Sequence, residues 1–138
     1  MKRYAVTAAI AACLLAQTYS QPAHAQGAAY SDGKIKIGIL TDLSGQLSDS
    51  TGQGSIAAAQ MAVEDFSGAV NGTPVELIFA DHQNKADIGA STARRWYDVD
   101  QVDAIIDVPN SAVALAVQQI TKEANRVALF SSPASSDL

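Results

Sequence analysis

The sequence contains little of the material from which metal sites and many catalytic sites are built. It has one cysteine, Cys13, and two histidines, His24 and His82, among 138 residues. Only His82 lies beyond the first 25 residues, and no cysteine does. A disulfide framework is therefore excluded for the rest of the chain. A zinc site and a Ser–His triad also lack their usual parts.

Nucleotide-binding and acidic catalytic motifs are missing as well. The glycine-containing stretch 45–54 has neither the Walker pattern nor G-x-G-x-x-G. Asp42, Asp81 and Asp107 end or follow predicted strands, where a metal-dependent phosphotransferase or hydrolase would place carboxylates. No adjacent acidic pair follows the first predicted strand, and no Asp-x-Asp lies at any of these strand ends. We therefore expect no enzyme, no metal site and no cofactor.

The apolar run at the N-terminus, residues 5–16, is too short to span a bilayer. It follows Lys2 and Arg3 and precedes the small-x-small sequence 23–25, which is the pattern of a secretory signal peptide cleaved after Ala25. The four residues ending at Cys13 resemble a lipobox, but the apolar run continues past them. We interpret residues 1–25 as a cleaved signal peptide, without a lipid anchor on Cys13, and expect the mature chain outside the cytoplasm.

The net charge of the mature chain limits the classes of partner that it can bind. The formal charge of −5 becomes −7 without residues 1–25, because Lys2 and Arg3 leave and all 14 acidic residues stay. An acidic chain is a poor partner for nucleic acid or anionic lipid. Its length suffices for one compact domain.

The pattern after a flexible lead-in, residues 26–33, predicts alternating strands and helices. Four segments rich in apolar and β-branched residues favour strands, and their composition suits a parallel sheet covered on both faces. Apolar residues recur at helical spacing between them. The order βαβαβαβ predicts a doubly wound α/β fold. We expect strands at 34–40, 74–80, 103–108 and 127–130, and helical stripes at Ile56/Ala59/Val63/Phe66, Ile88/Thr92/Trp96 and Val113/Val117/Ile120/Ala124.

Some residues predict local structure. Asn84, and either Asn110 or Ser111, are candidate N-caps of the second and third helices. Asn71-Gly72 indicates a turn before the second strand. We interpret Trp96-Tyr97, in the middle of a helix, as packing residues.

The loops after the four strands are polar and rich in hydroxyl groups. In an open parallel sheet these loops meet at one edge, where ligands bind. Hydroxyls and free N–H groups at helix N-termini suit a carboxylate or another anion. Ser111, at the start of a long amphipathic helix, is the strongest candidate. The loops run over 41–54, 81–84, 109–111 and 131–136.

Five stretches of sequence together carry a resemblance to a known family. They are residues 37–45, 57–64, 80–83, 93–95 and 131–138. In combination they resemble the periplasmic substrate-binding proteins of branched-chain amino acid type ABC transporters, the leucine-binding-protein-like family. The resemblance covers essentially all of residues 34–138.

The resemblance implies a two-lobed protein that closes on an amino acid or related small carboxylate. Such a protein delivers its ligand to ABC permease subunits in the inner membrane. By position, the family's carboxylate-binding loops correspond to Asn110-Ser111 and to Pro133-Ala134-Ser135. The first two loops would line the same cleft through Leu43, Ser44, Asp81 and His82.

Family members run to several hundred residues, so the resemblance implies an N-terminal fragment. Residues 34–138 would form the first, incomplete lobe of a type I periplasmic binding protein fold. A lobe that binds alone exposes its half of the cleft to water and should bind weakly. Two alternatives stay open: an extracellular ligand-sensing domain of a receptor, and a non-functional truncated gene product.

Overall fold

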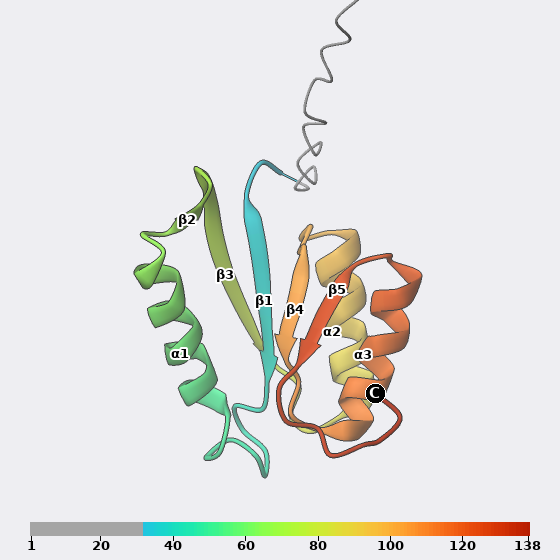
Figure 1. Cartoon of the computed structure of the whole chain (residues 1–138). Coiled ribbons are helices and arrows are strands. Elements are labelled where there is room, and N and C mark those ends of the chain that lie inside the picture. The colour runs from blue at the N-terminus through green and yellow to red at the C-terminus, as the bar shows by residue number, and fades with distance from the viewer. Residues whose placement is uncertain (1–31) are drawn as a thin grey trace, which may run out of the picture.

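The computed structural model describes residues 32–138, which form an open sheet with helices on both faces (Figure 1). The predicted signal peptide and most of the predicted lead-in lie outside the described residues. The four predicted strands and three predicted helices are all confirmed, and each strand end lies within one residue of its predicted place. The elements are β1 (Ile35–Thr41), α1 (Gly52–Asp65), β2 (Ala69–Val70), β3 (Thr73–Asp81), α2 (Ala86–Asp98), β4 (Ala104–Asp107), α3 (Ser111–Glu123) and β5 (Val127–Phe130).

The sheet has the strand order β2-β3-β1-β4-β5, with β1 at its centre. Strands β3, β1, β4 and β5 are parallel, and Ile39 of β1 is in register with Phe79 of β3 and Ile106 of β4. The chain first moves from β1 to β3 and then crosses back to β4. This reversal is the switch point of a doubly wound sheet, and it lies between β1 and β4. The predicted fold class is confirmed.

The edge strand β2 was not predicted. It pairs antiparallel with β3, with Val70 opposite Thr73. The connecting residues Asn71 and Gly72 have φ values of 50° and 83°, the left-handed conformations of a tight two-residue hairpin. The turn at Asn71-Gly72 is therefore confirmed. A strand of two residues is too short to show a period in the sequence.

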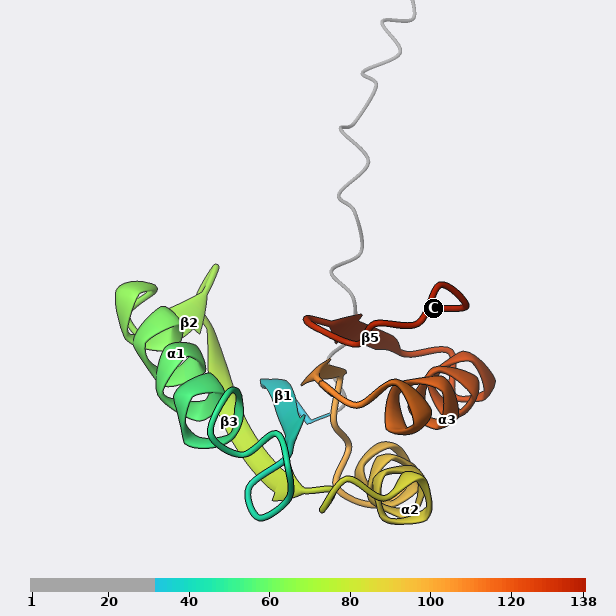
Figure 2. The same cartoon turned by 90° about the horizontal axis from the view of Figure 1, so that it is seen from below.

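The main core lies between the sheet and the helices α2 and α3, which pack side by side on one face (Figure 2). Trp96 packs so closely on β1 that a Cβ atom at Gly38 would come within 2.6 Å of its ring. Tyr97 is 6% exposed and its hydroxyl is 3.0 Å from Thr121 Oγ1. Both residues are packing residues, as predicted.

The opposite face is covered by α1, whose main contacts are with β1 and β3. Of its predicted stripe, Ile56 is buried, and Ala59 and Val63 are partly buried. The prediction for Phe66 is wrong: this residue is the C-cap, beyond the last helical turn, and 68% exposed. A cavity of about 200 Å³ remains between the helix and the strands, so this layer is loosely packed.

One predicted N-cap is confirmed and one is wrong. Asn110 caps α3, because its side-chain oxygen accepts a hydrogen bond from Val113 N–H at 3.0 Å. Asn84 does not cap α2, since the N-cap is Lys85 and Asn84 has a φ of 57°. Its own N–H donates to His82 Nδ1 at 3.0 Å, which holds Asn84 in a left-handed turn before the helix.

Within residues 32–138, no helix combines the length and the apolar character needed to cross a bilayer.

Candidate ligand-binding rim

The carboxyl ends of β1, β3, β4 and β5 meet at one edge of the sheet, at the lower end of Figure 1. We call the loops that follow these strands the rim. It consists of residues 42–51, 82–85, 108–110 and 131–138, together with the first turn of α3. Because every loop begins at this edge, the rim gathers polar side chains from distant parts of the sequence.

The loop after β1 folds around a buried carboxylate. Asp42 has no exposed surface, and its two oxygens accept hydrogen bonds from Gly45 N–H at 2.7 Å and Leu47 N–H at 2.9 Å. A Cβ atom at Gly45 would lie 2.6 Å from both oxygens, so this position needs glycine. Asp42 is therefore a structural residue of the rim, a role that the sequence analysis missed.

Asp81, at the end of β3, holds the first two loops together. Its carboxylate accepts hydrogen bonds from Leu43 N–H at 2.9 Å, Ser44 Oγ at 2.6 Å and Gln83 N–H at 2.8 Å. Burial alone would raise the pKa of Asp81, but these three hydrogen bonds outweigh it and the pKa lies below its usual value. The structure thus brings together Leu43, Ser44 and Asp81, three of the predicted ligand-binding residues.

His82 lies beneath the rim and has no exposed surface. Because Nδ1 accepts a hydrogen bond from Asn84 N–H, the neutral ring carries its hydrogen on Nε2, and that buried atom has no hydrogen-bond partner. Burial lowers the pKa of His82, although Asp42, Asp81 and Asp107 pull it upward. The structure therefore places this predicted site residue among the supports of the rim and not on its open surface.

The two predicted carboxylate-binding loops touch each other. Ser111 Oγ accepts a hydrogen bond from Ala134 N–H at 3.0 Å, and Ser135 Oγ accepts one from Asp137 N–H at 3.2 Å. Pro133 is partly buried between them. The N–H groups of Ser111 and Ala112, in the first turn of α3, have no hydrogen-bond partner among the described residues. Two free donors thus point out of the start of the helix beside the fourth loop.

A second link between these loops was missed. Asp107 Oδ1 accepts a hydrogen bond from Ser131 Oγ, while Asp107 Oδ2 is buried without a partner. Asp107 and Val108 have φ values of 80° and 53°, which are unusual for residues with side chains. Aspartate adopts positive φ more readily than most residues, but the β-branched valine does not, so the sequence gives only a weak signal for this backbone shape.

The part of the rim beside α3 presents hydrogen-bond donors and no metal-binding cluster. No group of three or more histidine, cysteine, aspartate or glutamate side chains within residues 32–138 is arranged to hold a metal ion. Asp42 and Asp81 are occupied by loop amides, and Asn110 by the cap of α3. Beside α3 the surface carries hydroxyls and helix N-terminal N–H groups, which suit a carboxylate, whereas Asp49 and Asp137 are exposed elsewhere on the rim.

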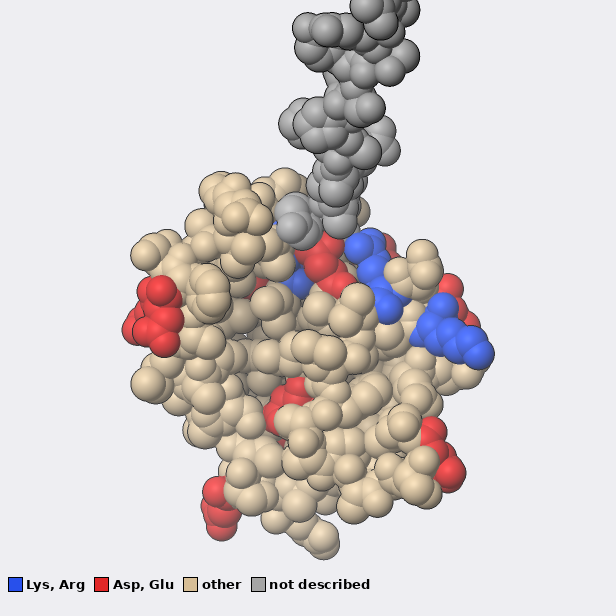
Figure 3. Space-filling model, in the orientation of Figure 1, with Lys and Arg blue, Asp and Glu red and all other residues tan. Residues whose placement is uncertain are grey.

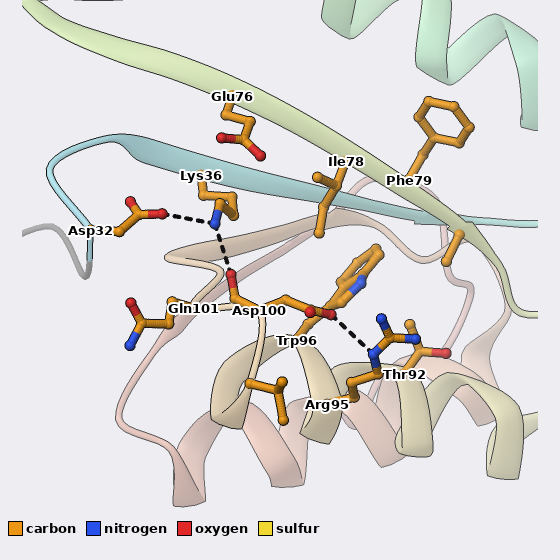
Figure 4. Close-up of a pocket in the computed structure, with 12 residues that line it drawn as sticks. Asp32, Lys36, Glu76, Ile78, Phe79, Thr92, Arg95, Trp96, Asp100 and Gln101 are labelled. Carbon is orange, nitrogen blue, oxygen red and sulfur yellow. Dashed lines mark hydrogen bonds and ion pairs between the residues drawn. The ribbon is translucent and has the colours of Figure 1, made fainter.

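Another cavity lies away from the rim, between α2 and the β1–β3 pair (Figure 4). It measures about 670 Å³. Lys36 Nζ lies 2.8 Å from Asp32 and 2.9 Å from the carbonyl oxygen of Asp100, and Arg95 lies 3.2 Å from the Asp100 carboxylate. The charged groups are thus already paired with one another. Lys36 lies near the start of β1 and Asp32 precedes that strand, so this cavity extends to the end of the sheet opposite the rim.

Comparison with known proteins identifies the family. A family model described as a periplasmic binding protein matches residues 34–138. A periplasmic binding protein from Burkholderia mallei is 45% identical, with a TM-score of 0.75, over 77% of this chain and 28% of that one. A branched-chain amino acid ABC transporter periplasmic ligand-binding protein from Burkholderia xenovorans is also 45% identical, with a TM-score of 0.71. The match covers 74% of this chain and 27% of that one.

More distantly, the leucine-binding protein LivK from Thermotoga maritima is 28% identical, with a TM-score of 0.67, over 73% of this chain and 28% of that one. No curated protein matches the chain. The chain spans a little over a quarter of the length of these solved structures. By its family match over residues 34–138, the chain belongs to the periplasmic binding proteins.

Proposed function

We propose that the rim is one half of the ligand-binding cleft of an extracytoplasmic solute-binding protein. The ligand is an amino acid or a related small carboxylate, and the complete protein delivers it to an ABC permease. The family match and the names of the Burkholderia xenovorans and Thermotoga maritima relatives support this role. The signal peptide predicted for residues 1–25 would place the protein in the periplasm.

One observation carries the proposal: the loops after β4 and β5 are joined by the hydrogen bond between Ser111 and Ala134. This contact sets the Ser111 hydroxyl, the free amides of Ser111 and Ala112 and the fourth loop around one point. A carboxylate at that point would accept hydrogen bonds from N–H groups and would face the positive end of the α3 dipole. Leu43 and Ser44, on the neighbouring loop, would contact the rest of the ligand.

The test is an NMR titration of residues 26–138 labelled with ¹⁵N, because this method detects the weak binding expected of a half-cleft. Leucine, valine and benzoate are added in turn, and leucinol serves as the control that lacks a carboxylate. We expect shifts of the Ser111, Ala112, Ala134 and Ser135 amides with the carboxylates and none with leucinol. Ser111→Ala should weaken the shifts, while Ser91→Ala on α2 should not.

Two results would contradict the proposal. One is the absence of any shift at the rim with each of the three carboxylates. The other is an equal response to leucine and leucinol, because binding would then not depend on the carboxylate.

A further inference from the structure

The hairpin between β2 and β3 carries an asparagine followed by a glycine, Asn71 and Gly72, and both residues are exposed. Neither the Asn71 side chain nor the Gly72 N–H group has a hydrogen-bond partner within residues 32–138. Figure 3 shows this turn at the upper left, where it projects from the surface and carries no charged side chain. The turn is therefore open to water and is held only by its backbone.

An asparagine followed by glycine can undergo a reaction that needs no reagent but water. The backbone nitrogen of Gly72 attacks Cγ of Asn71, and a succinimide ring forms. The proton of the attacking nitrogen leaves with the side-chain nitrogen as ammonia. Water then opens the ring at one of its two carbonyl carbons and gives either aspartate or isoaspartate. Glycine favours the attack, because it has no side chain to hinder its nitrogen and accepts most backbone conformations.

The other three asparagines of the chain, Asn84, Asn110 and Asn125, lack this combination of features. The amide nitrogens that follow Asn84 and Asn125 donate hydrogen bonds to backbone oxygens at 2.8 Å and 3.0 Å. The side chain of Asn110 is occupied by the cap of α3. Lysine, serine and arginine follow these three asparagines, and each has a side chain beside the attacking nitrogen. Asn71 is thus singled out by its neighbour and by its free groups.

The reaction at Asn71 requires the hairpin to open. Asn71 has a φ of 50°, and a left-handed backbone turns the following nitrogen away from the side chain. Strand β2 has two residues, and its main links to β3 are the pairing of Val70 with Thr73 and the 2.9 Å hydrogen bond from Val75 N–H to the carbonyl oxygen of Gly68. So short a pairing at a sheet edge opens at little cost in free energy. The reactive conformation is therefore reached by local opening while the rest of the fold stays intact.

We propose that Asn71 is a site of spontaneous deamidation and that its isoaspartyl product releases β2 from the sheet. Isoaspartate places an additional carbon atom in the backbone, which a tight two-residue hairpin turn cannot accommodate. Aspartate leaves the backbone unchanged, and Asp-Gly suits the same type of turn as Asn-Gly. The two products should thus differ in structure, because only isoaspartate prevents the hairpin from closing again.

Release of β2 would also affect the layer beneath α1. Val70 and Val75 line the cavity of about 200 Å³ between α1 and the strands. Gly68 N–H donates to the carbonyl oxygen of Val63, in the last turn of α1, at 2.9 Å. Loss of β2 opens the cavity to water and leaves the end of α1 without this support. The proposal concerns the end of the sheet opposite the rim, and it does not depend on ligand binding.

Incubation of the whole chain at mildly alkaline pH, followed by proteolysis and mass spectrometry, tests the chemical step. We expect the peptide that contains Asn71 to acquire the mass of an acid in place of an amide and to separate chromatographically into two products. The peptides of Asn84, Asn110 and Asn125 should react about tenfold more slowly or less, because hydrogen bonds must break first. A rate at Asn71 no greater than the rates at the other three would overturn the proposal.

Hydrogen exchange of backbone amides tests the release of β2. After incubation, residues 63–75 of the unsubstituted chain should exchange faster than in a fresh sample. Asn71→Gly retains a favoured hairpin turn and cannot deamidate, so incubation should not change its exchange. Fresh Asn71→Asp represents the aspartyl product and should exchange as slowly as the fresh unsubstituted chain.

Unchanged exchange over residues 63–75 in a sample rich in isoaspartate would overturn the structural part of the proposal. Equal acceleration in incubated Asn71→Gly would do the same, because the change would then not come from Asn71. If a variant does not fold, the comparison of fresh and incubated unsubstituted chain still decides. No ligand is added, so these results are independent of any test of carboxylate binding.

Discussion

At the scale of single residues, the rim depends on acidic side chains that bind backbone amides of the chain itself. Asp42 closes the loop after β1 and Asp81 joins that loop to the next one. Their hydrogen bonds to loop amides give both carboxylates a structural role, which is to hold the shape of the rim.

Replacement of Asp81 measures the strength of this link. Asp81→Asn removes the charge that three donors share, and we expect the free energy of unfolding to fall by about 1–3 kcal/mol. Urea denaturation checks this, with Asp49→Asn as the matched control because Asp49 is exposed in the loop after β1, which Asp81 binds. Equal effects of the two substitutions would contradict the role of Asp81.

His82 makes stability depend on pH near neutrality. Its pKa in the folded chain is lowered from the ordinary value of 6.5. Between the folded pKa and 6.5, the unfolded chain binds a proton that the folded chain does not, so stability rises with pH through this window. We expect the free energy of unfolding to fall as pH drops from 7.5 toward 5. The depressed pKa of Asp81 acts separately, below 3.8.

His82→Asn keeps an acceptor near Asn84 N–H but does not titrate. The free energy of unfolding of this variant, measured by urea denaturation at the same pH values, should depend on pH much less than that of the unsubstituted chain. An unchanged slope in the variant would show that another group is responsible.

Contacts of the rim that follow from the order of strands and loops can be predicted from the sequence, whereas contacts that depend on strand register or helix packing cannot. Polar residues at strand ends must meet at one edge, so the sequence alone predicts that Ser111 and residues 133–135 are neighbours. The link between Asp107 and Ser131 depends instead on the β4–β5 register and on a left-handed backbone at Asp107. The burial of His82 depends on how α2 and α3 pack, which residue spacing does not reveal.

At the scale of elements, strong periodicity determined what could be predicted. The parallel strands and the three helices have clear patterns and were placed correctly. Strand β2 has two residues and no pattern, and Phe66 continues the stripe of α1 although the helix has ended. Helix ends depend on capping contacts that a stripe cannot show.

The packing of α2 on α3 provides a prediction at this scale. A Cβ atom at Gly89 would overlap Val113 Cγ1, so Gly89→Ala should lower the free energy of unfolding by about 1–3 kcal/mol. The double variant Gly89→Ala/Val113→Ala should cost less than the sum of the two single changes, because the overlap is gone. Urea denaturation of the three variants checks this.

Gly54→Ala is the matched control, since nothing lies within 4 Å of a Cβ atom at this position in α1. Alanine is the better helix former, and this change should raise stability by about 0.5–1 kcal/mol. A loss at Gly54 equal to that at Gly89 would show that the effect is not the contact with Val113.

At the scale of the whole molecule, helices α2 and α3 cover one face of the sheet, whereas α1 covers the other face mainly over β1 and β3. Leu129 of β5 lines the surface groove beside α1 and is 62% exposed. In residues 26–138, Leu129→Gln should therefore change the free energy of unfolding by less than about 0.5 kcal/mol and reduce binding of an apolar dye. Urea denaturation and dye fluorescence check this, and a loss of about 2 kcal/mol or more would contradict it.

The carboxylate of Asp81 joins the first two loops and the hydrogen bond between Ser111 and Ala134 joins the other two, so that all four loops are tied in pairs before any ligand arrives. A ligand then has little chain to order, so the entropy lost on binding should be small for the protein. The low affinity expected of the half-cleft would come from contacts that are missing and not from disorder in those that exist. A second surface placed opposite the rim could thus raise affinity without any change in the rim itself.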